Sequence, residues 1–172
     1  MMHLVAGDLF NQDVECLVNP WNMNYTPSFL LLPCGVSGAL RKKAGREPFV
    51  QLSRKGTLSP GTAVLTGGGL LKQKIIHVAA LKWYWRSSEA IIEKCVRNAL
   101  ILASAENIKS IAFPLIGSGT GGVRPEKSFQ AIERAISQSV YAGDITVVCF
   151  SVCPLAFSAP GVISDSGCNM AK

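Results

Sequence analysis

The regular alternation of short apolar runs with longer amphipathic segments constrains the fold of this chain more than any other feature of its sequence. Six apolar runs bounded by turn residues predict strands, at residues 3–6, 14–18, 63–66, 75–80, 108–116 and 145–152. Three other segments carry apolar residues every three or four positions and predict helices, at residues 36–44, from Ser87 or Ser88 to about 102, and at 125–136. This alternation indicates an α/β fold, a three-layer α/β/α sandwich with a central mixed, largely parallel sheet.

Length and composition limit this fold to one domain. The chain has 172 residues, 48% hydrophobic and 16% charged, against about 25% charged in an average soluble protein, so it is globular rather than disordered. No apolar stretch reaches the roughly 20 residues of a membrane helix, and the first residues lack the pattern of a signal peptide. We therefore expect a soluble cytoplasmic domain over residues 1–153. Residues 154–172, rich in Ser, Ala, Gly and Pro, are expected to form a C-terminal extension or flexible tail.

Net charge bears on the partners of this chain, and the positions of its cysteines and histidines bear on disulfides and metal sites. The net charge of +6 favours an anionic partner, such as nucleic acid, a nucleotide or an acidic protein surface, although basic charge can also serve solubility alone. The cysteines form no C-x-x-C pair and mostly lie in apolar runs, so buried free thiols are expected at Cys16, Cys34, Cys95, Cys149, Cys153 and Cys168. His3 and His77 lie far from any cysteine pair, so neither a metal site nor a cofactor is expected.

The most informative segment is a glycine-rich loop at residues 117–122, which reads G-S-G-T-G-G between a predicted strand and a predicted helix. Backbone N–H groups of such a loop can surround an anion at a helix N-terminus, and Ser118 and Thr120 add hydroxyl groups. Gly119 and Gly121 are expected to adopt conformations, or to approach an anion so closely, that a Cβ would intrude. A glycine-rich tight turn is the alternative interpretation.

Two further turns carry residues that suit a ligand. N-P-W-N-M-N at residues 19–24 follows the second predicted strand, and Asn amides there can donate to and accept from sugar hydroxyls. P-C-G-V-S-G at residues 33–38 opens the first predicted helix and offers a second helix N-terminus for a phosphate. Turn-forming asparagines and an ordinary capped helix start are the alternatives.

Taken together, these segments resemble the macro domain family, an ADP-ribose-binding α/β/α module. Gly7-Asp8-Leu9 resembles the opening G-D-I of that family, and V-N-P-W-N at residues 18–22 resembles its V-N-A-A-N. G-V-S-G-A-L at residues 35–40 resembles its first loop, residues 76–78 its I-H-T/V strand, and residues 112–122 its A-F-P and glycine-rich second loop. The resemblance covers about residues 2–151, with the motifs in family order.

The resemblance implies a role for each matching residue. Asp8 would accept a hydrogen bond from the adenine amine, the backbone of Leu9 would contact the ring, and Phe150 would stack on it. Asn22 would face the distal ribose. The diphosphate would lie between two loops, one formed by Gly35, Val36 and Ser37 and the other by Gly117, Ser118, Gly119, Thr120, Gly121 and Gly122.

Three departures from the family pattern bear on activity. Hydrolases of the commonest type in the family carry an acid after G-G-V that positions the attacking water, and Ser37 stands there instead. Gly121 replaces an aromatic residue that often contacts the distal ribose. The stretch between Asn22 and Gly35 is longer than usual, so residues 23–32 could cover that ribose and supply replacement contacts.

Residues 82–86 and His77 have structural as well as functional interpretations. K-W-Y-W-R at residues 82–86 would form a wall near the ligand, or a stacking surface for bases, or simply the packed corner between a strand and a helix. His77 is interpreted as a hydrogen-bonded core histidine rather than a catalyst.

We expect the chain to bind ADP-ribose and to hydrolyse ADP-ribosyl linkages on modified proteins or on ADP-ribose esters. Asn22 and Ser37 are the candidate catalytic residues, because they would orient a water at the distal ribose, although neither is a strong base. The alternative is an ADP-ribose-binding module without turnover, and nucleic-acid binding through the basic surface is a further alternative. No membrane partner is expected, and the oligomeric state stays open.

Overall fold

The computed structural model describes residues 1–24, 35–82 and 84–150, in which six strands pair into one sheet between two layers of helices. The strands are β1 (Met2–Ala6), β2 (Cys16–Trp21), β3 (Ala63–Thr66), β4 (Lys74–Ala79), β5 (Ser110–Pro114) and β6 (Asp144–Cys149). The helices are α1 (Gly35–Ala44), α2 (Glu47–Ser53), α3 (Glu89–Ala105) and α4 (Pro125–Ser137), with a 3-10 turn, η1 (Leu9–Asn11). The predicted strands and helices are confirmed, with boundaries shifted by a few residues. The prediction lacks α2, which is too short to show a repeating apolar stripe.

The strand order β1-β6-β5-β2-β4-β3 confirms a mixed, largely parallel sheet. The last pair, β4 with β3, is antiparallel, and the other neighbours run parallel. Because parallel strands point the same way, the loops that follow β1, β2, β4, β5 and β6 leave from one end of the sheet. That end is where an open α/β sheet forms its ligand site.

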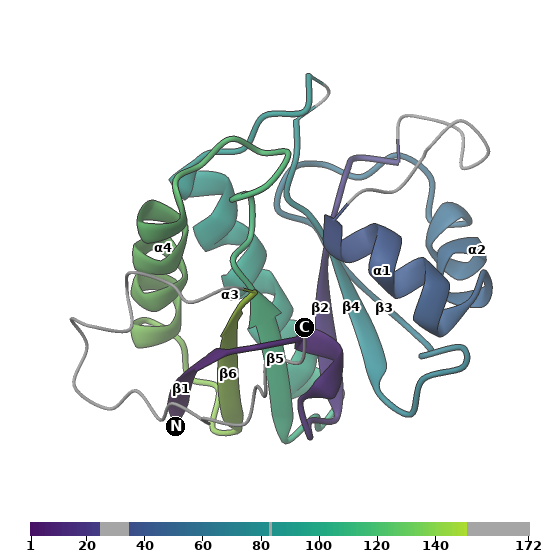
Figure 1. Ribbon diagram of the computed structural model, residues 1–172, viewed down its shortest axis with the longest axis horizontal. Helices are drawn as coiled ribbons and strands as arrows, with labels where there is room; N and C mark the ends of the chain where they lie inside the picture. Colours follow the sequence, from purple (N-terminus) through teal and green to yellow (C-terminus); the bar gives the residue numbers. More distant parts are fainter. Residues whose placement is uncertain (25–34, 83, 151–172) are drawn as a thin grey trace, which may run out of the picture.

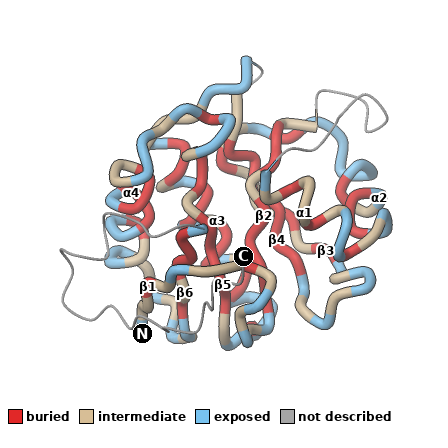
Figure 2. The backbone as a smooth tube through the Cα atoms, in the orientation of Figure 1, coloured by how far each residue is buried: buried red, intermediate tan, exposed pale blue. Residues whose placement is uncertain are grey.

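Two helix layers cover the two faces of the sheet. Figure 1 shows α3 and α4 together on one side of the molecule and α1 and α2 on the other. Side chains alternate along β2, so that Cys16 and Val18 join the core under α3 and α4, whereas Trp21 packs with α1 and α2. Figure 2 shows the buried residues following the strands and the inner sides of the helices.

Local sequence explains where α3 and α4 begin. Ser88 caps α3, because its side chain accepts a hydrogen bond from the Ile91 N–H, and Pro125 opens α4 at a position that needs no N–H partner. None of the helices in the described residues is long and apolar enough to cross a membrane.

Half of the predicted free thiols can be placed. Cys16, Cys95 and Cys149 are buried as thiols, and burial raises the pKa of Cys16 and of Cys95 to about 12, so both stay protonated. Cys34, Cys153, Cys168 and the extension predicted at residues 154–172 lie outside the described residues.

Stability should depend strongly on the core under α3 and α4. Phe113, on β5, is fully buried there, so Phe113→Ala is expected to lower the free energy of unfolding by about 3–5 kcal/mol. Urea denaturation measures the change. Phe150→Ala is the matched control, because the Phe150 ring is 90% exposed and its loss should leave stability nearly unchanged. A loss below about 1 kcal/mol at Phe113 would contradict its place in the core.

Candidate functional site

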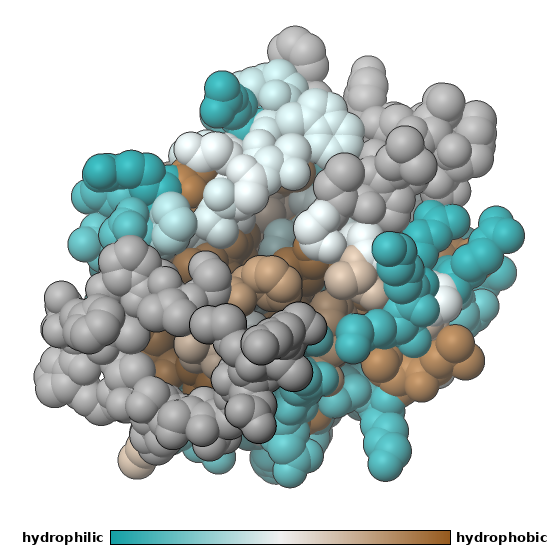
Figure 3. Space-filling view, in the orientation of Figure 1, coloured by the Kyte–Doolittle hydropathy of each residue, from teal (hydrophilic) through white to brown (hydrophobic). Residues whose placement is uncertain are grey.

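A cavity opens at the carboxyl ends of the parallel strands. Its volume is about 680 Å³, inside the range of about 300–1,000 Å³ typical of small-molecule sites. At least one lining residue follows each parallel strand, among them Gly7 after β1, Asn22 after β2, Leu81 after β4, Leu115 after β5 and Phe150 after β6. Figure 3 shows hydrophobic residues in the hollowed centre of this face, with paler residues above them.

The fold brings nearly all the predicted site residues to this cavity. Those that line it are Asp8, Leu9, Asn22, Gly35, Val36, Ser37, Gly117, Ser118, Gly119, Thr120, Gly121 and Phe150. Gly122 is the exception: it shapes the loop, with φ of +71°, without lining the cavity. The ligand contacts assigned to these residues stay predictions.

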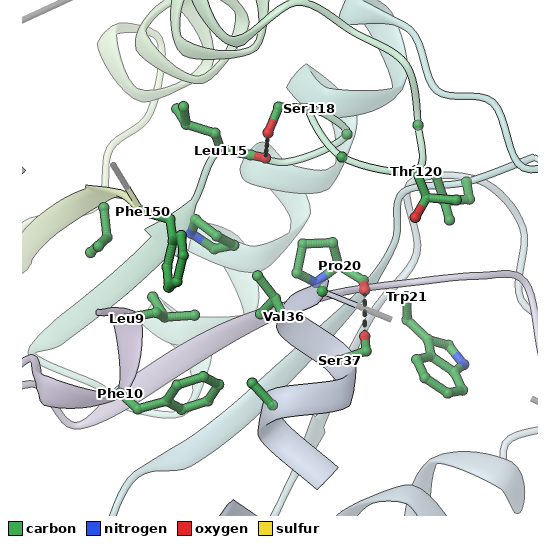
Figure 4. A pocket seen from close by; sticks show the side chains of 18 of the residues that line it. Leu9, Phe10, Pro20, Trp21, Val36, Ser37, Leu115, Ser118, Thr120 and Phe150 are labelled. Carbon is green, nitrogen blue, oxygen red and sulfur yellow. Dashed lines mark hydrogen bonds between the residues drawn. The ribbon is translucent and has the colours of Figure 1, made fainter. Parts of the chain in front are cut away.

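Asp8, Leu9 and Phe150 gather at one end of the cavity. Asp8 Oδ1 accepts a hydrogen bond of 3.0 Å from the Phe10 N–H, and Asp8 Oδ2 lies 3.7 Å from Lys43 Nζ. Leu9 is buried, both residues line the cavity, and Figure 4 shows the Phe150 ring pointing toward Leu9. An apolar shelf beside a carboxylate suits a flat base that carries an exocyclic amine.

The glycine-rich loop at residues 117–122 forms one wall of the cavity. Gly117 has φ of +75°, and the turn is closed by hydrogen bonds from the Gly122 N–H to the Gly119 carbonyl (3.1 Å) and from the Val123 N–H to the Gly117 carbonyl (3.0 Å). Within the described residues, the N–H groups of Gly119, Thr120 and Gly121 make no hydrogen bond. Consecutive unpaired N–H groups at a cavity rim suit an anion.

The first turn of α1 forms another part of the lining. Gly35 begins this helix with φ of +58°, and Val36 and Ser37 follow it at the cavity. The first N–H groups of a helix have no partner within the helix and carry the positive end of its dipole. Two sets of backbone N–H donors thus line one cavity, which suits a ligand with more than one phosphate charge.

At Gly119 the protein itself leaves room for a Cβ, so only a close approach to an anion would exclude one there, and that stays a prediction; at Gly121 the protein's own atoms exclude a Cβ. A Cβ at Gly119 would meet no atom within 4 Å, and its φ is not positive. A Cβ at Gly121 would lie 2.6 Å from the Gly117 carbonyl oxygen and 2.9 Å from Ser87 Cβ. The protein's own backbone therefore excludes a side chain at Gly121, whereas the left-handed conformations fall on the two ends of the loop.

Ser37 connects the cavity to a buried polar group. Its Oγ lies 2.8 Å from Asn19 Oδ1 and 2.9 Å from the Pro20 carbonyl oxygen, and Figure 4 shows the latter bond beside Trp21. His77 is fully buried and hydrogen-bonded to Asn19 and Thr66. Burial lowers the pKa of His77 to about 3, so the ring is neutral near pH 7. The prediction of a core histidine is confirmed.

Trp85 is a lining residue that the predicted site lacks. It borders the cavity with an exposed ring and a φ of +60°, which is unusual for a bulky residue. Hydrogen bonds from the Lys82 N–H to the Arg86 carbonyl and from the Trp85 N–H to the Lys82 carbonyl, both 2.9 Å, close the turn that carries it. Part of K-W-Y-W-R is therefore a wall of the cavity, while Trp83 lies outside the described residues.

Charged residues are few in this cavity. Asp8 and Lys43 are the charged side chains among its described lining residues. In residues 1–24, 35–82 and 84–150, no group of three or more His, Cys, Asp or Glu side chains could hold a metal ion. Neutral hydroxyl, amide and backbone groups therefore make up most of the polar lining.

The parallel sheet, the two helix layers and the cavity between a glycine-rich loop and a helix start define an α/β/α protein with a nucleotide-sized site. Residues 18–132 match the Macro domain family. The chain belongs to this family, and the resemblance inferred from its motifs is confirmed.

Individual relatives extend this match over most of the chain. A macro domain-containing protein of Caldanaerobacter subterraneus is 31% identical over 86% of this chain and 85% of its own length. A Klebsiella pneumoniae protein named O-acetyl-ADP-ribose deacetylase is 32% identical over 78% of each chain. A variant of the Oceanobacillus iheyensis macrodomain, solved with ADPR, has a TM-score of 0.75 and 28% identity over 87% of this chain and 84% of that one.

The two glycines of the loop should respond differently to the same substitution. Gly121→Ala is expected to lower the free energy of unfolding by about 1–3 kcal/mol, because its Cβ would press on the Gly117 carbonyl. Gly119→Ala, the matched control, should change it by less than about 0.5 kcal/mol, since its Cβ meets open space. Thermal and urea unfolding measure both. Equal losses would contradict the loop geometry.

Proposed function

We propose that this protein binds ADP-ribose in the cavity at the strand ends and hydrolyses ADP-ribosyl linkages, either on modified proteins or in ADP-ribose esters. The observation that carries the proposal is the pairing of two donor sets in one cavity. The unpaired N–H groups of residues 119–121 and the first turn of α1 both line it. The names of the Klebsiella relative and the ligand of the Oceanobacillus structure support the same ligand class.

Binding of the base is the first part of the proposal. Adenine would lie between Leu9 and Phe150, with its amine donating to Asp8. The exposed Phe150 ring would lose water contact on stacking, which contributes favourable free energy. The diphosphate would then reach the glycine-rich loop, and the distal ribose would lie toward Ser37, Asn22 and Trp85.

Hydrolysis is the second part. Ser37 and Asn22 are nearly buried at the cavity, so they can hold a water or a ribose hydroxyl in a fixed place. Neither group is a strong base, and the only acid among the described lining residues is Asp8, at the opposite, base-binding part of the proposed pose. Orientation rather than proton abstraction would therefore drive the reaction, which implies slow turnover.

Asp8→Asn tests the placement of the base. The substituted amide would keep the cap on the Phe10 N–H through its carbonyl oxygen but would lose the charge-assisted bond to adenine. Affinity for ADP-ribose should fall by about 1–2 kcal/mol in calorimetric titration, whereas ribose 5-phosphate, which has no base, should bind as before.

Asp13→Asn is the control for net charge, because Asp13 is exposed and does not line the cavity. Removing any acid makes the protein more basic, which by itself favours an anion. A weaker affinity seen only with the Asp8 substitution would therefore report the base contact. Equal losses for ADP-ribose and ribose 5-phosphate would place adenine elsewhere.

Turnover is tested with O-acetyl-ADP-ribose and with a mono-ADP-ribosylated protein, by chromatographic detection of free ADP-ribose. We expect slow release, with kcat reduced at least about tenfold by Ser37→Ala, because one water-orienting group is lost. Ser53→Ala, on the exposed side of α2, is the control and should keep the wild-type rate. Tight ADP-ribose binding without release of product from either substrate would contradict hydrolysis.

That outcome would favour a binding module without turnover, the second candidate function. The observation in its favour is Ser37, which stands where the resemblance implies a water-positioning acid. A module of this kind needs the donors of both loops but no group that activates water.

A further inference from the structure

A continuous chain of hydrogen bonds runs from the cavity across three neighbouring strands of the sheet. Ser37 Oγ, on α1, lies 2.8 Å from Asn19 Oδ1 on β2. Asn19 Nδ2 lies 3.0 Å from His77 Nδ1 on β4, and His77 Nε2 lies 3.0 Å from Thr66 Oγ1 on β3. The chain ends where Thr66 Oγ1 lies 3.1 Å from the Gly67 carbonyl oxygen.

Strand pairing explains why these side chains meet. Asn19 is the direct partner of His77 in the parallel β2–β4 ladder, so both side chains point to the same face of the sheet. Phe49 of α2 packs against the ring of His77 in an edge-to-face contact, with 5.6 Å between the ring centroids. Ser37, Asn19, His77 and Thr66 are all buried, so each polar group depends on its neighbours in the chain.

The direction of every bond follows from the last acceptor. A backbone carbonyl only accepts, so the hydroxyl proton of Thr66 is directed at Gly67. Thr66 Oγ1 must then accept from His77, which places the ring proton on Nε2 and leaves Nδ1 as an acceptor. Nδ1 receives a proton from the amide of Asn19, and the carbonyl oxygen of that amide consequently faces Ser37.

This direction requires a neutral ring. An imidazolium would present an N–H to Asn19 Nδ2, which is itself a donor. The lowered pKa of His77, caused by burial, agrees with this requirement.

At the cavity, the chain of hydrogen bonds determines whether Ser37 donates or accepts a hydrogen bond. Inside the protein its hydroxyl faces two acceptors, Asn19 Oδ1 and the Pro20 carbonyl oxygen, so its single proton stays inside. Its oxygen can then only accept on the cavity side. We propose that His77 is a positioning residue that acts through Asn19 to hold Ser37 as a hydrogen-bond acceptor, so that the cavity selects a donor group there.

This inference rests on the proposed function for the identity of the ligand. It specifies which hydrogen bond the protein makes with the distal ribose of ADP-ribose. A hydroxyl of the distal ribose, or a water, would donate to Ser37. ADP, which has no distal ribose, would not reach this contact. If the amide of Asn19 turned over, its Nδ2–H would donate to Ser37 Oγ while the Ser37 proton turned to the Pro20 carbonyl oxygen; one lone pair of Ser37 would then be occupied inside the protein, which would weaken the acceptor that it offers to the cavity.

The tautomer of His77 can be measured without any ligand. His3→Gln leaves His77 as the single histidine of the chain, and ¹⁵N NMR of the labelled ring distinguishes a protonated from an unprotonated ring nitrogen. We expect the Nε2–H form, unchanged between about pH 5 and pH 8 because the pKa lies far below that range. A dominant Nδ1–H form would overturn the inference, whether or not ADP-ribose binds.

A second experiment connects the tautomer to the ligand. Thr66→Val keeps the shape of the side chain but removes the hydroxyl that orients His77, and Thr66→Ser restores that hydroxyl; Thr66 does not line the cavity. With Thr66→Val, affinity for ADP-ribose should fall about fivefold to tenfold, affinity for ADP should change less than about twofold, and the ring should lose its pure Nε2–H form. Thr66→Ser should match the wild type.

The outcomes separate the two proposals. The positioning role of His77 would be overturned if Thr66→Val weakened the binding of ADP-ribose and of ADP equally. It would also be overturned if this substitution changed neither the ratio of the two affinities nor the tautomer of His77. Absence of ADP-ribose binding by the wild type would contradict the proposed function, and the ¹⁵N measurement would then still decide the direction of the chain.

Discussion

The placement of β2 between two parallel neighbours determines the geometry of the whole site. Its register sets Asn19 beside His77 of β4 and Leu17 beside Ala112 of β5. Because these strands point the same way, the turn after β2, the glycine-rich loop after β5 and the Trp85 turn after β4 meet at one end of the sheet. The lining segments that follow β2, β4 and β5 depend on this pairing, while those that follow β1 and β6 depend on the β1–β6 and β5–β6 pairs.

Burial of β2 also explains the polar chain behind the cavity. The sheet is covered by helices on both faces, so Asn19 and His77 have no access to water and must satisfy each other. The same burial keeps His77 neutral and so keeps the bonds pointing one way. In the proposed mode of binding, Ser37 would thereby serve as an oriented acceptor in a part of the cavity where the described lining residues include no acid.

Sequence periodicity predicted the strands, three of the helices and the fold class, because these depend on local repeats of apolar residues. Unusual local composition pointed to the glycine-rich loop and to the turns at residues 19–24 and 33–38, and the resemblance to the macro domain family added Asp8, Leu9, Asn22 and Phe150; residues from each of these segments line the cavity. The short helix α2 lacks such a signal. The aromatic segment at residues 82–86 suggested a wall near the ligand among other interpretations, and only the structure shows that Trp85 lines the cavity. The backbone of Trp85 takes its conformation from a turn that docks against the glycine-rich loop through the bond from the Ser87 N–H to the Gly121 carbonyl.

The sequence by itself determined the α/β fold class and the segments that supply backbone donors, because helix starts, glycines and strand periods are local properties of the chain, and the resemblance of its motifs indicated the macro domain family. Only the tertiary structure decided that Gly121 is closed by the Gly117 backbone while Gly119 is open, and that Ser37, Asn19 and His77 form one directed chain. These features depend on atoms from segments distant in sequence, and their positions follow from strand register and packing.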